Sequence, residues 1–202
     1  MSQATTCIAT IVIGKTYQQS FDFFSRERLV RYCKRHGYDL QILTTAIRDL
    51  PGKKLTWQKT LLPELPWWKD YAQVCVLDSD ILIAHDAPAL PVIPPGKIGC
   101  VADKLPNQIN SGVLIYQPDD AIAACFEEAL KDQDPFWDQR ALSQVMAPKN
   151  MAWLIDTRFN RLFFFMCWTF PRSLFQRHWF YHACSSKTKL HLIHFWLKLT
   201  GR

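Results

Sequence analysis

Short apolar runs rich in β-branched residues alternate along this chain with longer amphipathic stretches. Such runs predict buried strands, and the stretches between them have the apolar spacing of helices. We expect strands over 7–14, 40–44, 74–83, 97–102, 112–116 and 151–155, and helices over 21–36, 56–62, 120–131 and 136–146. This alternation predicts a single α/β domain, with a mostly parallel sheet flanked by helices on both faces.

Composition excludes two classes of protein. Hydrophobic residues make up 49% of the chain and charged residues 21%, which argues against disorder. The most apolar stretch, 162–170, is less than half the roughly 20 residues that a membrane-spanning helix needs.

The N-terminal segment has no basic region before its apolar run, so we expect no signal peptide. The seven cysteines form no CxxC pair, which favours reduced thiols and a cytoplasmic location.

Positive charge is concentrated near the C-terminus. Residues 151–202 contain eight Lys and Arg but one acidic residue, Asp156. The aromatic, basic stretch 163–181 has three interpretations: core packing, a platform for an acceptor, or a patch that makes peripheral contact with a membrane. A basic nucleic-acid-binding module is an alternative function, but it leaves the acidic pair described next unexplained, so no nucleic acid is expected.

The segment VCVLDSDILI places two acidic residues inside an apolar run. Period-2 geometry of a strand directs Asp78 and Asp80 to the same side, with Ser79 opposite. Two like charges close together near a core are costly unless a cation neutralises them, and oxygen ligands suit a divalent ion. A second DxD pattern, Asp132 and Asp134, lies in a solvated setting. Its context differs, and we expect the ion only at the first pair.

Six further segments accompany this one in a recognisable order. They are CIATIVIG, a helix with Lys59 and LLPEL, NSGVLIYQP, WDQRALSQ, LIDTRFNRL and LIHFWLK. In this order the chain resembles nucleotide-sugar glycosyltransferases of the GT-A fold, most closely the family 8 type and the compact GT-A domains of chlorella-virus glycosyltransferases. The resemblance covers about residues 7–198. It implies one GT-A domain over 1–202, with a nucleotide-binding part over about 1–105 and a sugar and acceptor part over about 106–202.

The resemblance also implies a metal site. Asp78 and Asp80 match the DxD pair that holds Mn²⁺ or Mg²⁺ against the donor diphosphate, and His194 in LIHF matches the third ligand. An imidazole ligand favours Mn²⁺ over Mg²⁺. A separate zinc site at His178-x₃-His182 with Cys184 has suitable spacing but no evident fourth ligand.

Other matched positions would hold the donor. The resemblance implies that Asn110 and Gly112 lie at the sugar, that Asp138 and Gln139 form the catalytic pair, and that Lys59 and Lys198 face the phosphates. The alternatives are a turn at 110–112, an Asp that caps a helix, and a solvated lysine.

Further candidates belong to the donor site by their position. Thr10, Val12 and Tyr17 lie at the end of the first strand and are candidates for the nucleobase pocket, with Tyr17 stacked on uracil. Asp103 ends the fourth strand, and Ser79 lies between the two acidic residues. Asn160 in DTRFN matches a family Asn with a structural role near the site.

The sequence therefore predicts a cytoplasmic, metal-dependent glycosyltransferase. Its donor would be a UDP-sugar and its acceptor a glycan, glycoprotein or lipid-linked carbohydrate, with retention of configuration favoured by the Asp138–Gln139 pair. The alternatives are a catalytically inactive nucleotide-sugar-binding domain and the nucleic-acid-binding module. A nucleotidyltransferase would need a glycine-rich basic loop after the first strand, and VIGKTYQQS does not supply one.

Overall fold

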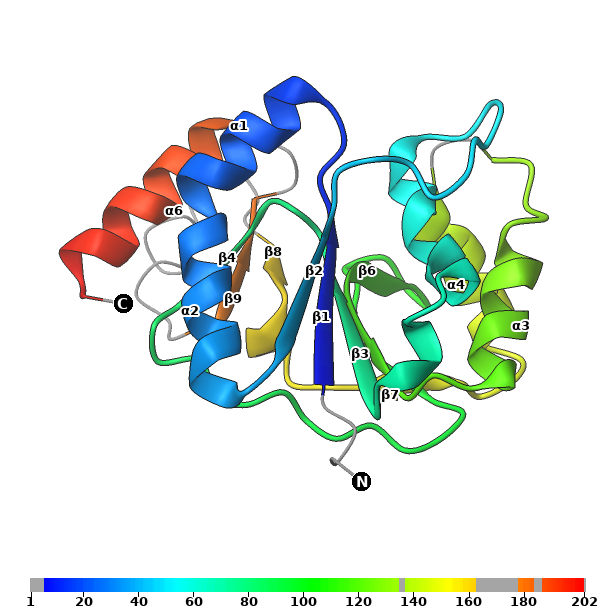
Figure 1. Cartoon of the computed structure of the whole chain (residues 1–202). Helices are drawn as coiled ribbons and strands as arrows, with labels where there is room; N and C mark the ends of the chain where they lie inside the picture. Colours follow the sequence, from blue (N-terminus) through cyan, green and yellow to red (C-terminus); the bar gives the residue numbers. More distant parts are fainter. Residues whose placement is uncertain (1–5, 135–136, 163–177, 184–186, 202) are drawn as a thin grey trace.

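A six-stranded sheet forms the centre of the computed structural model, which describes residues 6–134, 137–162, 178–183 and 187–201 (Figure 1). The strand order is β2-β1-β3-β6-β5-β7. The strands are β1 (Thr6–Ile11), β2 (Asp39–Leu43), β3 (Gln73–Leu77), β5 (Ile98–Ala102), β6 (Ile109–Tyr116) and β7 (Ala152–Leu154). Neighbours are parallel except at β6, which is antiparallel to β3 and β5. The predicted α/β domain with a mostly parallel sheet is confirmed.

Helices cover both faces of this sheet (Figure 1). One face carries α1 (Lys15–Phe24) and α2 (Arg26–His36), and the other carries the 3₁₀ helix η1 (Leu55–Glu64), α3 (Asp120–Ala129) and α4 (Asp138–Met146). Strand periodicity explains this division, since alternate side chains of a strand point to opposite faces. In β3, Val74 and Val76 pack in the cluster that contains η1, α3 and α4, whereas Cys75 and Leu77 pack in the cluster of α1 and α2.

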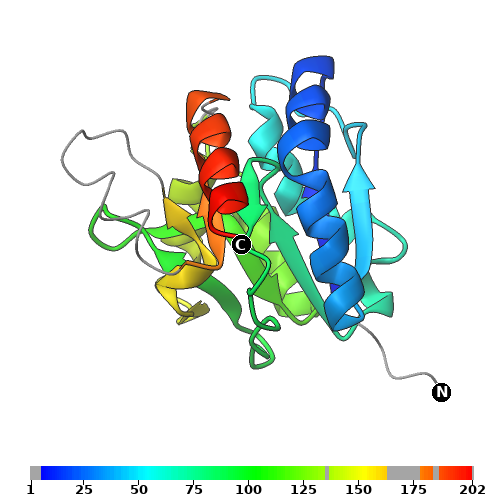
Figure 2. The same cartoon turned by 90° about the vertical axis from the view of Figure 1, so that its left-hand side faces the viewer.

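A smaller sheet lies beside the first. Its strand order is β4-β9-β8, and its strands are β4 (Ile81–Ile83), β8 (Arg161–Leu162) and β9 (Phe180–His182). The helix α6 (Lys187–Leu199) buries Ile193 and Leu197 against Leu82 and Tyr181 of this sheet. It lies beside α1 (Figures 1 and 2).

Two expected elements are divided in the structure. The helix over 21–36 is two helices that meet at Ser25. The strand over 74–83 is interrupted: the backbone N–H of Asp78 donates to Gly112 O at 2.9 Å, and that of Ile81 donates to Asp78 O at 3.2 Å. The second bond closes a turn over residues 78–81, whereas the first still ties Asp78 to β6, so the chain leaves the large sheet at this turn and enters the small sheet at Ile81. The two aspartates therefore lie between the sheets rather than within one strand.

The remaining expectations concern membrane spans, the cysteines, the two parts of the chain and the aromatic stretch. No helix in the described part is both long enough and apolar enough to span a membrane. The described cysteines, Cys7, Cys33, Cys75, Cys100 and Cys125, are free and buried. The division into parts over about 1–105 and 106–202 stays a prediction. Most of the aromatic stretch 163–181, together with Cys184, lies outside the described residues.

A core substitution should test the central position of β6. Leu114 is fully buried and pairs with Val76 across β3 and β6. We expect Leu114→Ala to lower the free energy of unfolding by about 2–5 kcal/mol, because it leaves a cavity in a packed core. Urea unfolding followed by circular dichroism measures this loss. Leu105→Ala is the matched control, since Leu105 is exposed and its truncation should change little. An equal loss in both variants would contradict this assignment of the core.

Candidate active site

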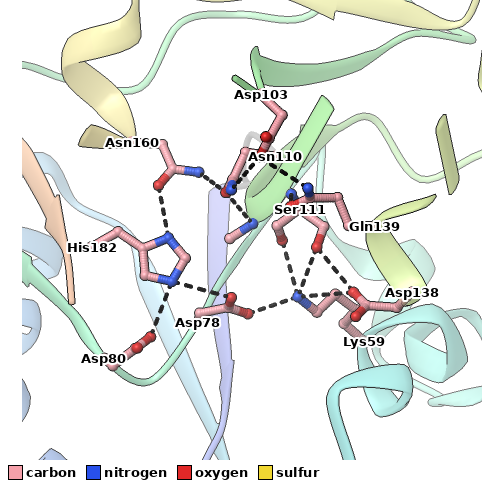
Figure 3. Close-up of polar contacts among 11 residues, drawn as sticks. Lys59, Asp78, Asp80, Asp103, Asn110, Ser111, Asp138, Gln139, Asn160 and His182 are labelled. Carbon is pink, nitrogen blue, oxygen red and sulfur yellow. Dashed lines mark hydrogen bonds and ion pairs between the residues drawn. The ribbon is translucent and has the colours of Figure 1, made fainter. Parts of the chain in front are cut away.

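The turn between the two sheets brings two carboxylates to a histidine. In the small sheet, β4 pairs antiparallel with β9 so that Ile81 lies opposite His182. The backbone N–H of Ala183 also donates to the carbonyl of Asp80 at 3.1 Å. The Nε2 atom of His182 consequently lies 3.3 Å from Asp80 Oδ1 and 3.7 Å from Asp78 Oδ2 (Figure 3).

Asp78, Asp80 and His182 form a group that could hold a metal ion. One ligand atom from each residue lies within 4.8 Å of the other two. Burial alone would lower the pKa of the His182 ring, but the nearby carboxylates of Asp80 and Asp78 outweigh burial and raise it. A proton on this ring and a bound divalent ion would therefore interact with the same two carboxylates. Two carboxylates and one imidazole are suitable ligands for a divalent metal ion.

Gly112 allows the histidine to approach this closely. A Cβ atom at position 112 would lie 2.6 Å from Cε1 and 2.7 Å from Nδ1 of His182, and 3.0 Å from Asn110 Oδ1. Separations under 3.0 Å are steric clashes, so the His182 ring or the backbone at position 112 would have to shift. The glycine is therefore needed for close packing between β6 and the imidazole ring.

Lys59 places a buried ammonium group behind the aspartates. It is 3% exposed, and its Nζ lies 2.7 Å from Asp78 Oδ1 and 3.4 Å from Asp138 Oδ2. Nζ also donates to the carbonyl of Ser111 at 3.0 Å. Burial alone would lower the pKa of Lys59, but the charges of Asp138 and Asp78 outweigh burial and raise it. Lys59 is therefore charged, and it connects η1 with the end of β3, with β6 and with α4.

Amide side chains extend the network to Asp103 and to His182 (Figure 3). Asp103 Oδ2 accepts from Gln139 Nε2 at 2.9 Å and from Asn110 Nδ2 at 3.3 Å. Asn110 Oδ1 accepts from Asn160 Nδ2, and Asn160 Oδ1 lies 3.1 Å from Nδ1 of His182. These bonds form a continuous path from Gln139 to the aspartate turn.

A cavity of about 640 Å³ opens at this turn. It is lined by several of the sequence-predicted residues, namely Tyr17, Lys59, Asp78, Ser79 and Asp80, and also by His182. The turn that bears the aspartates directly follows β3, and Ile11, the last residue of β1, lines the same cavity. In open α/β sheets, ligands bind beyond the carboxyl ends of parallel strands such as these.

Two predicted residues lie elsewhere. His194 is on α6, where its ring contacts Phe23 and Phe24, and Lys198 is on the same helix. Both line a separate cavity with Arg28 and Arg31 of α2. Burial, with Lys198 and Arg28 nearby, lowers the pKa of His194. The structure groups His182, rather than His194, with the aspartates, and this differs from the sequence-based assignment of the third ligand.

Two candidates for the nucleobase pocket, Thr10 and Val12, are buried in the structure. Thr10 Oγ1 is buried with no hydrogen-bond partner among the described residues. Val12 is buried in the apolar cluster of α1 and α2. Tyr17, in contrast, is 54% exposed and lines the cavity.

Two residues of the network had no assigned role in the sequence analysis. His182 appeared only in the possible zinc pattern with His178. In the structure, the His178 ring packs against Tyr181. Ser111 donates its hydroxyl to Asp138 Oδ2 at 2.9 Å, and its backbone N–H donates to Gln139 Oε1 at 3.2 Å. Its place in the NSG segment, next to Asn110, was the available indication.

Comparison with solved structures agrees with the fold described above. No family model and no curated protein matches this sequence. Among solved structures, the chain is similar to a glycosyltransferase involved in the glycosylation of the major capsid of PBCV-1, with a TM-score of 0.67 and 14% identity over 95% of this chain and 99% of that chain. It is also similar to the apo form of the glycosyltransferase GlyE in Streptococcus pneumoniae TIGR4, with a TM-score of 0.52 and 14% identity over 78% of this chain and 46% of that chain. The chain thus has a GT-A-like glycosyltransferase fold.

Enlarging Gly112 should disturb the imidazole. We expect Gly112→Ala to lower the free energy of unfolding by about 1–3 kcal/mol, because its methyl group overlaps the His182 ring. The loss should be smaller when the same substitution is made in a His182→Ala background. A double-mutant cycle based on urea unfolding measures this coupling. Additive losses would show that the ring is not what excludes a side chain at position 112.

Removing the buried ammonium group should destabilise the protein. We expect Lys59→Met to cost about 3–5 kcal/mol, because it leaves Asp138 buried without its cation.

The same substitution at an exposed lysine serves as the control. Lys69 pairs with Asp120 on the surface, so Lys69→Met should leave the free energy of unfolding nearly unchanged. Chemical unfolding at neutral pH compares the two variants. Equal losses in the two variants would contradict the explanation by the buried ion pair.

Proposed function

We propose that this chain is a metal-dependent glycosyltransferase that transfers a sugar from a UDP-sugar to a carbohydrate-bearing acceptor. One observation carries the proposal: Asp78, Asp80 and His182 lie together in a cavity at the carboxyl ends of parallel strands, in a GT-A-like fold. The acceptor would be a glycan, a glycoprotein or a lipid-linked carbohydrate. A cytoplasmic location and peripheral membrane contact through the basic C-terminal part are further elements of the proposal.

The metal would be Mn²⁺, held by the two carboxylates and by His182 Nε2. Their donor atoms are close enough to share one ion, and the mixed oxygen and nitrogen set favours Mn²⁺ over Mg²⁺. A bound divalent ion would neutralise the negative charge that develops on the departing nucleoside diphosphate.

Lys59 would supply a second positive charge at the diphosphate. It lines the same cavity as the aspartates, and the pKa of its ammonium group is raised, so the group stays charged near neutral pH. Because its partners Asp78 and Asp138 already fix its position, little reorganisation would be needed when a donor binds.

The remaining residues would bind the two ends of the donor. Tyr17, exposed at the cavity, would stack on the uracil ring. Asn110 and Asp103 would position the sugar, and Asp138 with Gln139 would act at the anomeric carbon. Retention of configuration is part of the proposal and depends on the identity of the last pair.

Metal-dependent nucleotide binding tests the proposal. We expect calorimetry to detect UDP binding to the wild type that is much tighter with Mn²⁺ than without it. Asp80→Asn should weaken binding in Mn²⁺ by at least about tenfold, because it removes a charged ligand. Asp120→Asn is the control, since Asp120 is an exposed residue at the start of α3 and should bind as the wild type does.

The outcomes separate the alternatives. Absence of UDP binding with any divalent ion, together with salt-sensitive binding of oligonucleotides, would contradict the proposal and favour the nucleic-acid-binding module. Metal-dependent UDP binding with no transfer across a broad acceptor panel would favour an inactive nucleotide-sugar-binding domain.

A further inference from the structure

Asn160 is buried beside the metal-binding group. It is 2% exposed and follows the short helix η3 (Thr157–Phe159). Its amide contacts Asn110 on one side and the His182 ring on the other (Figure 3). We propose that Asn160 is a positioning residue that holds His182 in the tautomer with hydrogen on Nδ1 and a lone pair on Nε2. The benefit to metal binding rests on the function proposed above, whereas the tautomer itself does not.

A backbone N–H group sets the direction of these hydrogen bonds. The N–H of Gly112 donates to Asn110 Oδ1 at 2.9 Å. A backbone N–H can only donate, so the oxygen of the Asn110 amide must face Gly112. The amide nitrogen of Asn110 then faces Asp103 Oδ2 at 3.3 Å, where a carboxylate accepts it. Two fixed partners therefore set the orientation of this amide.

That orientation determines the next amide and then the ring. Asn110 Oδ1 also faces Asn160, and because an oxygen can only accept, Asn160 must present its NH₂ group there. The carbonyl oxygen of Asn160 is then left to face His182 Nδ1 at 3.1 Å. An acceptor at this distance requires a hydrogen on Nδ1. The relay from Gly112 N–H thus fixes which nitrogen of His182 carries the hydrogen.

The opposite side of the ring would favour the other tautomer. Nε2 faces Asp80 Oδ1 at 3.3 Å and Asp78 Oδ2 at 3.7 Å, and both carboxylates attract a hydrogen on Nε2. A neutral ring with its hydrogen on Nε2 has no lone pair there for a metal. Asn160 opposes this preference by requiring the hydrogen on Nδ1. An outer partner of this kind orients a metal-binding histidine and raises its basicity.

Two substitutions at position 160 distinguish this role from a merely structural one. Asn160→Leu removes both polar groups while keeping a side chain of similar size. Asn160→Asp keeps an oxygen acceptor for Nδ1–H but loses the donor to Asn110. We expect the leucine variant to bind Mn²⁺ about 10- to 100-fold more weakly than the wild type, and the aspartate variant to recover most of this affinity despite lower stability.

Nuclear magnetic resonance reads the tautomer directly. With ¹⁵N-labelled histidine in metal-free protein, at a pH where the ring is neutral, we expect His182 to carry its hydrogen on Nδ1 in the wild type and in Asn160→Asp. In Asn160→Leu the hydrogen should move to Nε2. Circular dichroism checks that each variant is folded, and the wild-type spectrum alone tests the assignment if the leucine variant does not fold.

Failure of the inference differs from failure of the proposed function. A wild-type ring with hydrogen on Nε2, or a folded leucine variant with wild-type tautomer and Mn²⁺ affinity, would overturn the role of Asn160. A wild type that binds no Mn²⁺, yet shows the Nδ1–H tautomer lost in Asn160→Leu, would overturn the proposed function and leave the positioning of the ring in place.

Discussion

The buried ammonium group of Lys59 is the charge on which the site depends. Asp138 is 6% exposed, and a carboxylate at that depth is costly without a partner cation. Lys59 provides it, and the same group contacts Asp78 and the carbonyl of Ser111. One side chain from η1 therefore holds three other segments of the chain at fixed distances. The turn that carries the acidic pair is one of them.

The meeting of two sheets explains why that turn faces a histidine. A strand that continued through Asp78 and Asp80 would have kept both carboxylates within the large sheet. Instead the chain turns after Leu77, and β4 pairs with β9, a strand about 100 residues later in the sequence. Such pairing brings His182 to the turn, and the absence of a side chain at Gly112 gives the ring room. The candidate metal group is a consequence of tertiary pairing.

These facts explain what the sequence could and could not predict. Local patterns were sufficient for the α/β fold, because apolar runs and helical spacing depend on nearby residues. The apolar run around Asp78 and Asp80 directed attention to that pair, and the resemblance to GT-A glycosyltransferases directed attention to Asn110 and Gln139. The structure brings all four into one network. They could not identify His182 as the partner, because its position depends on a register between distant strands. His194 matched a motif by order along the chain, but α6 places its ring against Phe23 and Phe24.

The charges of the network give a physical reason for amides at its connecting positions. The side chains labelled in Figure 3 include four carboxylates, one ammonium group and one imidazole, and the Asp103 carboxylate lies against the amides of Asn110 and Gln139 rather than against either cationic group. Additional acids between them would increase repulsion, whereas Asn110, Gln139 and Asn160 transmit hydrogen-bond direction without charge. At the aspartate turn, the carboxylates of Asp80 and Asp78 raise the pKa of His182, so its ring is favoured to hold a proton. A divalent ion would neutralise the same two carboxylates more completely, which is why proton and metal should compete for this group.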